Sequence, residues 1–454
     1  METDGPFRLI WHWKRLCQQR PATESYTLCV RRIFFLPLLC LPLVGAVSPD
    51  FAARREKLRH DIPNGVLVLF GNKESDDLHY GFYQDTNFYY LTGWEEPGGI
   101  LILTPEPEKD DPAFATRSQL PREILFLPQR VPTEEKWTGR KLGPDDNNAS
   151  SASGVKSVYA AERFESELRR LLESYANVYA VTGSAGEEHA RRIAPLRTFA
   201  DAGSRIAKLR MEKSPEEISA VQKATDISID AHLAAWKATK PGKYEYEIAS
   251  AMELTWLAAG CRRGAYAPIV GSGPNSTTLH YSRNSRRMDS GEVVVMDVAA
   301  ECGNYASDIT RTIPANGKFT ARQREIYNIV LGAQKAAIAA VKPGALITRA
   351  GLYQVAFEYI NTHGKDLHGE PLGKYFTHGL SHHVGLDVHD ASDNTTPLTA
   401  GMIITIEPGI YIPEENIGVR IEDTVLVTST GSRVMSAALP VDPDAIERAL
   451  AGGK

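Results

Sequence analysis

The chain has 454 residues, of which 43% are hydrophobic and 24% are charged. This length is enough for two ordinary domains, and the composition is typical of a globular protein with an ample core. The formal net charge of −5 is small for the length, which argues against a protein that binds nucleic acid or acidic membranes.

The cysteines show no pattern of paired ligands or bridges. Five cysteines cannot all pair, and three of them fall within the first 40 residues. The two in the body of the chain, Cys261 and Cys302, form no CxxC motif. We therefore expect neither a disulfide framework nor a zinc–thiolate site.

The first 47 residues are predicted to form a signal-like segment. Arg31 and Arg32 precede an apolar run at residues 33–47, which has small residues near its end. The run is short for a membrane span and contains two prolines. We expect export to the periplasm or the exterior, and residues 1–29 are not translated if synthesis starts near Val30. If the run is a buried hydrophobic segment instead, the protein is cytoplasmic.

A first α/β domain is predicted at residues 48–205. Apolar runs indicate buried strands, and amphipathic patterns at 53–62 and 165–176 indicate helices. The strands are expected at residues 65–71, 98–106 and 123–128. The aromatic residues of 88–94 are expected to pack in the core. No nucleophile or ligand cluster is found here, so the domain reads as a lid or an oligomerisation module.

A second domain is predicted at residues 206–454. The sequence Ser214-Pro-Glu-Glu217 is a capping box with proline at the first helical position. It opens a long helix that stops before Pro241-Gly242, and a second helix ends at Gly260. A loop with His280 comes next, and two further helices are expected at residues 321–341 and 349–364.

The stretch from Gly291 to Asp308 is predicted to be a β-hairpin. The apolar run 293–295 leads to Asp297, and a turn of small and polar residues separates it from Asp308. Two carboxylates brought together on neighbouring strands repel each other. A hard divalent cation would offset that repulsion.

Further candidate ligands follow in the last third of the chain. Residues 378–390 contain four histidines, namely His378, His382, His383 and His389. Glu407 and Glu422 lie in or beside apolar strands, where a carboxylate is unfavourable unless it is paired or bound to metal. Four carboxylates and an imidazole suit a pair of divalent ions such as Mn²⁺, Co²⁺ or Zn²⁺.

This ordered set resembles the five ligands of the pita-bread metallopeptidases: Asp297, Asp308, His382, Glu407 and Glu422. The strings SDITRT, HGLSHHVGLDVHD, IEPGIY and GVRIEDT look like the Xaa-Pro aminopeptidase (aminopeptidase P) and prolidase branch. NFYYLTGWEEPGGILIL is similar to the creatinase-like first domain of that branch. The resemblance spans roughly residues 50–450. It implies an α+β fold, with an N-terminal creatinase-like α/β domain and a C-terminal pita-bread catalytic domain whose curved antiparallel sheet is covered by helices.

The resemblance also implies two divalent metal ions per chain, with manganese as the first choice and cobalt or zinc as alternatives. Asp297 would hold one ion, and His382 with Glu407 would hold the other. Asp308 and Glu422 would bridge the pair. A hydroxide shared by the ions would attack the scissile carbonyl, and Glu407 would pass its proton to the leaving nitrogen.

Five other residues match functional positions of the family. His280 and His389 would contact substrate and stabilise the tetrahedral intermediate, and His378 would line the pocket near the proline. Tyr411 and Arg420 would support the site. Family members are commonly dimers or tetramers, so a homodimer or homotetramer is expected.

The function implied is hydrolysis of the bond between a first residue and a proline at position two of a peptide. A prolidase restricted to Xaa-Pro dipeptides is the alternative, and Ser381 favours the aminopeptidase. A pita-bread protein that binds without catalysis is a third reading, and the five intact ligands argue against it. Two departures from relatives are a short segment between Glu407 and Glu422, which predicts an open mouth, and Tyr83 where relatives often carry arginine. No partner is expected among nucleic acids, or in membranes beyond the signal segment.

Overall fold

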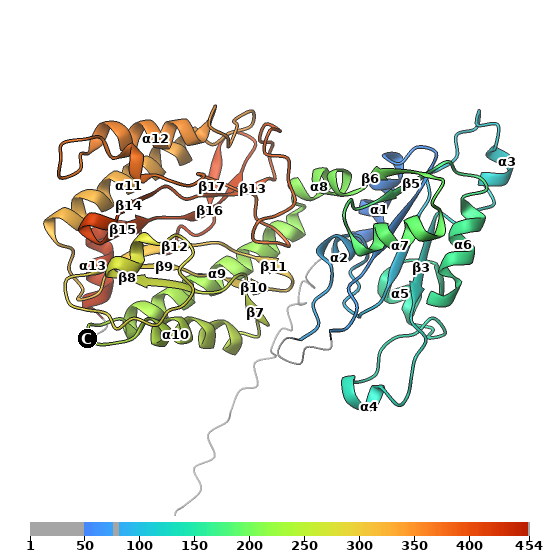
Figure 1. The fold of residues 1–454 in the computed structure, drawn as a ribbon, viewed down its shortest axis with the longest axis horizontal. Coiled ribbons are helices and arrows are strands. Elements are labelled where there is room, and N and C mark those ends of the chain that lie inside the picture. The colour runs from blue at the N-terminus through green and yellow to red at the C-terminus, as the bar shows by residue number, and fades with distance from the viewer. Residues whose placement is uncertain (1–49, 76–80, 453–454) are drawn as a thin grey trace, which may run out of the picture. The chain divides into compact units, whose positions relative to one another are not determined.

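The computed structural model describes residues 50–75 and 81–452, and the predicted signal segment lies outside the described residues. Among the helices of these two ranges, none combines the length and the apolar composition needed to cross a bilayer. The N-terminal part is built on one mixed sheet, and the C-terminal part on antiparallel sheets (Figure 1). The predicted two-domain α+β architecture is confirmed.

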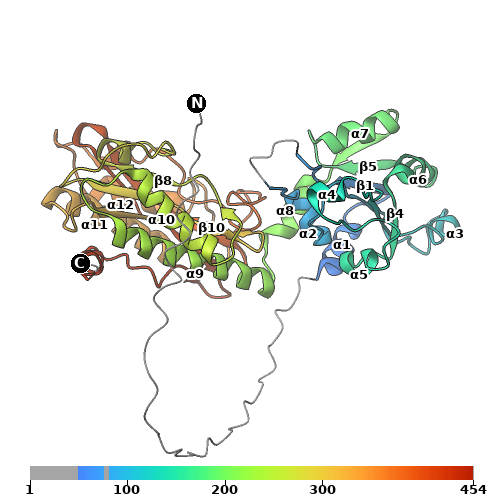
Figure 2. The same ribbon diagram turned by 90° about the horizontal axis from the view of Figure 1, so that it is seen from below.

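The N-terminal sheet has the strand order β4-β3-β2-β1-β5-β6. Alternate side chains of β1 point to opposite faces of the sheet, and both faces are covered. Val66 and Val68 pack in a core with residues of α6 and α7, while Leu67 and Leu69 pack with α1 and α2 on the other face (Figure 2). The strands are β1 Gly65–Phe70, β2 Ile100–Leu103, β3 Glu123–Leu127, β4 Ser157–Ala160, β5 Asn177–Ala180 and β6 Thr198–Asp201.

The helices of this part are mostly short. The helical elements are α1 Phe51–His60, α2 Thr86–Thr92, α3 Phe114–Arg117, α4 Glu135–Thr138, α5 Ala149–Ser153, η1 Ala161–Arg163, α6 Phe164–Leu171, α7 Ala185–Ile193 and α8 Gly203–Met211. The side chains of Phe88, Tyr90 and Trp94 are buried in the core, as the sequence predicts for this aromatic segment.

Long helices carry the C-terminal part. The predicted capping box at Ser214 is formed, since its side chain accepts from the Glu217 N–H while the Glu217 carboxylate accepts from the Ser214 N–H. α9 packs along α10, and α11 packs along α12 (Figures 1 and 2). The helices are α9 Pro215–Ala238, α10 Glu245–Ala258, α11 Ala321–Ala340, α12 Leu352–His363 and α13 Pro443–Ala451.

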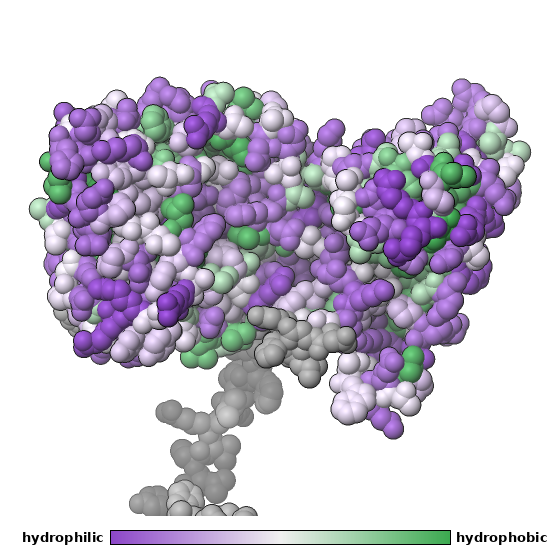
Figure 3. All heavy atoms as spheres, viewed as in Figure 1, coloured by the Kyte–Doolittle hydropathy of each residue, from purple (hydrophilic) through white to green (hydrophobic). Residues whose placement is uncertain are grey.

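Four small antiparallel sheets lie against these helices, with the orders β12-β9-β8, β13-β16-β17, β14-β15 and β11-β10-β7. Their strands and the connecting 3-10 turns are β7 Arg263–Gly264, β8 Ile269–Ser272, η2 Gly273–Thr277, β9 Val293–Asp297, β10 Ala300–Cys302, β11 Tyr305–Ala306, β12 Thr310–Pro314, η3 Leu372–Tyr375, β13 Ile403–Ile406, β14 Gly409–Ile412, η4 Pro413–Glu415, β15 Ile417–Arg420, β16 Asp423–Val427 and β17 Ser432–Val434. On the face drawn in Figure 3, hydrophobic residues form small groups separated by polar ones.

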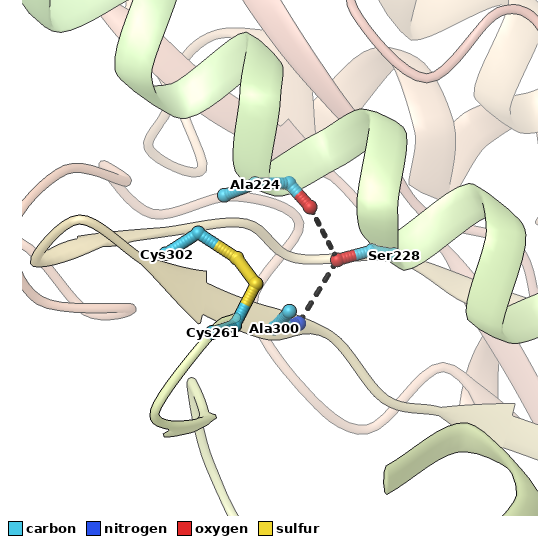
Figure 4. The surroundings of a disulfide bond; sticks show 5 residues. All are labelled: Ala224, Ser228, Cys261, Ala300 and Cys302. Carbon is cyan, nitrogen blue, oxygen red and sulfur yellow. Dashed lines mark hydrogen bonds between the residues drawn. A yellow bond between two sulfur atoms is a disulfide. The ribbon is translucent and has the colours of Figure 1, made fainter. Parts of the chain in front are cut away.

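A disulfide bond joins Cys261 to Cys302. The scattered cysteines predicted no disulfide framework, and this single bond was not predicted. Their pairing follows from the fold, because Arg263 of β7 lies opposite Glu301 of β10 and so brings the flanking cysteines together. Figure 4 shows the bond beside α9, where the Ser228 hydroxyl accepts from the N–H of Ala300 and donates to a backbone carbonyl of the helix.

Candidate metal centre

The first wall of the site is the strand pair β9–β12. Residues 293–296 of β9 are buried, so the strand is fixed in the core up to its last residue, Asp297. Asp297 lies opposite Thr310 of β12, and Asp308 stands just before that partner. The two aspartates therefore emerge at the same end of the strand pair, as the hairpin prediction required.

The second wall carries the two glutamates. Glu407 directly follows β13, and Glu422 lies between β15 and β16. The N–H of Glu422 donates to the carbonyl of Thr310 at 3.0 Å, and the Thr310 hydroxyl donates to the Glu422 carboxylate at 2.6 Å. Thr310 thereby joins the two walls beside the aspartates.

His382 reaches the same place from an irregular segment before β13. Thr405 of β13 fixes its backbone, because the Thr405 N–H donates to the His382 carbonyl at 2.9 Å and the Thr405 hydroxyl accepts from the His382 N–H at 3.1 Å. The ring Nε2 lies 3.3 Å from Asp308 and 3.5 Å from Glu407. One ligand atom each from Asp308, His382 and Glu422 lie within 4.8 Å of one another.

Tyr266 connects the remaining aspartate to this cluster. Its hydroxyl lies 2.6 Å from Oδ1 of Asp297 and 2.6 Å from Oδ1 of Asp308, and it can donate its proton to either. All five predicted ligands are thus gathered at one place. Tyr266 was not among the predicted site residues.

The crowding of carboxylates perturbs their protonation. Burial raises the pKa of Glu407 to about 7, and the charge of Asp308 adds to the rise. Burial and Asp308 also hold the pKa of Glu422 well above its ordinary value. For His382, burial alone would lower the pKa, but its hydrogen bond to Asp308 raises it to about 9. Glu407, Glu422 and His382 therefore hold protons more tightly than they would in water, because these protons reduce the repulsion between the buried negative charges.

Arg420, Tyr411 and His378 form a chain of contacts beside the cluster. The guanidinium of Arg420 donates to Asp297 at 2.6 Å and to the Tyr411 hydroxyl at 2.8 Å. That hydroxyl lies 2.8 Å from Nε2 of His378. Burial, followed by the Arg420 charge, lowers the pKa of His378 to about 4, so its ring is neutral at physiological pH.

Two adjoining cavities open onto the cluster. One, of about 260 Å³, is lined by Tyr266, Ile269 and Val388 besides the site residues, and the other, of about 230 Å³, is lined by Leu279 and Ser381 besides them. His280 and His389 line both. The His389 ring lies 4.2 Å from that of His382, between centroids. The residues predicted to contact substrate therefore surround the residues predicted to bind metal.

Comparison with known proteins assigns the chain to a family. Residues 219–429 match the sequence model of Metallopeptidase family M24, and residues 51–179 match that of the aminopeptidase P N-terminal domain. The Xaa-Pro aminopeptidase of Haemophilus influenzae is 35% identical over 88% of this chain and 96% of its own length. The chain belongs to metallopeptidase family M24. Human Xaa-Pro aminopeptidase 3 is 36% identical over 89% of this chain and 87% of its own length. Aminopeptidase P from Escherichia coli superposes with a TM-score of 0.80, at 30% identity, over 89% of this chain and 98% of that one.

The charge balance of this M24 site fits bound divalent cations. Four carboxylates meet there, and among the described residues that line the two cavities Arg420 is the only lysine or arginine. Such an excess of buried negative charge is unfavourable unless cations offset it. Oxygen ligands joined by one imidazole suit hard or borderline divalent metals.

The residues that surround the ligands of the M24 centre were not predicted from the sequence, because they look like ordinary strand or loop residues. Thr310 and Thr405 follow strand patterns, and Tyr266 lies in the loop between β7 and β8. Tyr266 is 31 residues from Asp297 along the chain. The one available signal for Tyr266 was its place in the loop that leads toward His280.

Proposed function

We propose that this chain is a metal-dependent Xaa-Pro aminopeptidase, which hydrolyses the bond between the first residue and a proline at position two and releases the first residue. The observation that carries the proposal is the convergence of four carboxylates and His382 beside two cavities lined by His280 and His389. The relatives named Xaa-Pro aminopeptidase support the same activity over nearly the whole chain.

We further propose two metal ions per chain, with manganese as the native metal and cobalt or zinc as substitutes. Asp297 would hold one ion, His382 and Glu407 the other, and Asp308 and Glu422 both. When bound, such ions lower the pKa of a coordinated water and polarise the scissile carbonyl. The hydrogen bonds of Tyr266, Thr310 and Thr405 orient these ligands before any ion arrives.

Within this scheme Glu407 moves the proton. Its carboxylate lies 3.5 Å from His382 and lines both cavities, where it could take the proton of the attacking water and pass it to the leaving nitrogen. His280 and His389 would donate to the oxygen of the tetrahedral intermediate, and His378 would border the proline ring. Arg420 and Tyr411 keep Asp297 and His378 in place through the contacts given above.

Cleavage of longer peptides is favoured over a prolidase activity. A dipeptidase gains from a cation that binds the free carboxylate of its substrate. Among the described residues that line the two cavities, Arg420 is the only lysine or arginine. Its guanidinium already donates to Asp297 and Tyr411. The segment between the two glutamates is a short hairpin, β14–β15, which supports a site that is open to longer peptides.

Export and self-association are further parts of the proposal. The Cys261–Cys302 disulfide supports an oxidising compartment such as the periplasm or the exterior, because disulfides rarely persist in a reducing cytosol. We propose a homodimer or homotetramer on the family resemblance. Cell fractionation and sedimentation in solution test these two points.

The experiment that tests the function is a metal-reconstituted assay on short peptides, with Gly-Pro and Arg-Pro-Pro compared. We expect cleavage of Arg-Pro-Pro to arginine and Pro-Pro, loss of activity with a chelator, and no activity of Glu407→Ala. Cleavage of Gly-Pro alone would mean a prolidase. A protein that stays inactive with every metal and yet binds the peptides would be a binding protein.

A further inference from the structure

Glu245 is a buried carboxylate with no role assigned to it by the mechanism above. It is the first residue of α10, and its side chain is fully shielded from solvent. The start of a helix favours negative charge, but a carboxylate in that place normally remains in water. A buried carboxylate requires several hydrogen-bond donors to offset the loss of hydration.

The donors come from a single segment, residues 272–286. Ser272 donates to Oε1 through its N–H at 2.8 Å and through its hydroxyl at 2.7 Å, and the Asn275 amide donates to the same oxygen at 3.1 Å. Oε2 accepts from the Tyr281 hydroxyl at 2.7 Å and from the Arg286 N–H at 2.8 Å. The carboxylate thus gathers donors from both ends and the middle of this segment.

The segment that Glu245 holds is the one that carries His280. Between η2 and β9 the backbone forms no regular strand or helix at this histidine, so no sheet or helix hydrogen-bond pattern fixes its position. Tyr281 directly follows it and is bound to Glu245. The carbonyl of Leu279, directly before it, lies 3.4 Å from the guanidinium of Arg420.

The opposite side of the segment rests on β15. The Ser276 hydroxyl accepts from the N–H of Gly418 at 2.8 Å. A side chain at position 418 would overlap the carbonyl oxygen of Ser276, so the close approach requires glycine. The segment is therefore held between β15 on one side and the Glu245 carboxylate on the other.

We propose that Glu245 is a positioning residue for catalysis: its carboxylate fixes the segment 272–286 so that His280 faces the metal centre. The inference rests on the proposed function, since it gives His280 a task at the reacting carbonyl. Glu245 itself lies away from the cavities and acts only through the segment. A displacement of a reacting group by about 1 Å is enough to lower a rate about 100-fold.

The test replaces the carboxylate with its neutral isostere, Glu245→Gln. The amide presents its own donors to groups that also donate, so we expect the segment to loosen. The expected result is a kcat on Arg-Pro-Pro lowered about 10- to 100-fold with a smaller change in KM. Faster amide hydrogen exchange in residues 272–286 should accompany it, and this readout does not depend on activity. Glu253→Gln, an exposed residue of the same helix, is the matched control and should behave as the wild type.

A double-mutant cycle separates positioning from a general loss of structure. If Glu245 acts through His280, adding Glu245→Gln to His280→Ala should lower kcat no further. Independent, additive losses would overturn the proposal, as would unchanged exchange in the segment. If Glu245→Gln does not fold, Tyr281→Phe and Asn275→Ala remove one donor each and should give smaller losses of the same kind. If the wild type cleaves no Xaa-Pro peptide, the proposed function fails, whereas the exchange measurement still decides whether Glu245 fixes the segment.

Discussion

The guanidinium of Arg420 lies 2.6 Å from the carboxylate of Asp297, and both side chains are withdrawn from solvent. The same group donates to Tyr411, to the Thr310 hydroxyl at 3.2 Å and to the Leu279 carbonyl. One planar cation therefore aligns a predicted metal ligand with strand β12 and with the segment that carries His280. Lysine has the same charge but cannot make these contacts together.

We expect Arg420→Lys to lower kcat/KM on Xaa-Pro peptides about 100-fold and to weaken metal binding, while the protein remains folded. Steady-state kinetics and metal titration against a competing chelator measure the two effects. Arg433→Lys, at an exposed position of strand β17, is the control, and it should leave both unchanged. Equal activity of Arg420→Lys and the wild type would show that charge alone is sufficient.

Much of the metal centre could be predicted because its ligands break the local pattern of the sequence. Asp297 ends an apolar strand, and Glu422 interrupts another, so each stands out as a buried charge that needs a partner. Glu245 and Tyr266 do not stand out, because a glutamate at a helix start and a tyrosine in a loop are common. Their roles depend on partners at 27 to 42 residues' distance along the chain, which only the folded backbone brings near. The Cys261–Cys302 bond escaped prediction for the same reason, since strand pairing places the two cysteines together.

The predicted boundary between residues 205 and 206 stays a prediction. The family matches cover residues 51–179 and 219–429 and leave the stretch between them unassigned. Helix α8, Gly203–Met211, crosses that point. Composition does not reveal a helix that crosses a domain junction. It indicates only the turn before the helix and the capping box after it.

Loss of the disulfide should destabilise the protein without removing the metal centre. Cys261 and Cys302 are 41 residues apart, and a disulfide that closes a loop of that size raises the unfolding free energy by about 4 kcal/mol relative to the reduced chain. We expect the double variant Cys261→Ser/Cys302→Ser to show a lower urea midpoint than the wild type, and a reducing agent to lower the wild-type midpoint equally. A reductant should not change the double variant. If reduction leaves the wild-type midpoint unchanged, the bond does not contribute to stability.

Asp390 offers a sharper test of buried charge. Its carboxylate accepts from Arg210 and, at 3.0 Å, from Lys213, and all three side chains are almost fully buried. Burial alone would raise the pKa of Asp390, but the charges of Lys213 and Arg210 lower it. Asp390→Asn leaves both cations with less compensation, so we expect a loss of about 3 kcal/mol in unfolding free energy.

Asp390→Asn should also disturb the position of the adjacent residue His389, so we expect this variant to have a lower kcat. Urea denaturation and peptide kinetics measure the two effects. Asp230→Asn, which removes the same charge from an exposed position on α9, is the matched control. A stability equal to that of the wild type would mean that Asp387, 2.7 Å from Arg210, compensates the cations by itself.

Protein from which the metal has been removed by a chelator should become less stable as the pH rises from 7 to 9. The folded-state pKa of His382 is about 9 against an ordinary value of 6.5, because Asp308 outweighs the effect of burial, so its stabilising proton is lost as pH rises through this window. Glu422, whose pKa is raised by burial and Asp308, changes stability in the same direction, since the folded chain holds a proton that the unfolded chain has released. The buried histidines with lowered pKa values, such as His232 at about 4, are neutral in both states above pH 7 and add no slope.

Thermal melts of chelated protein at pH 7, 8 and 9 should show a falling Tm, by about 5 °C overall. Metal-loaded protein should show a smaller fall, because bound cations replace the protons, and Glu422→Gln should flatten the slope of the chelated form. A chelated protein that gains stability over this range would contradict the interpretation that buried carboxylates crowd the centre and make its groups hold protons.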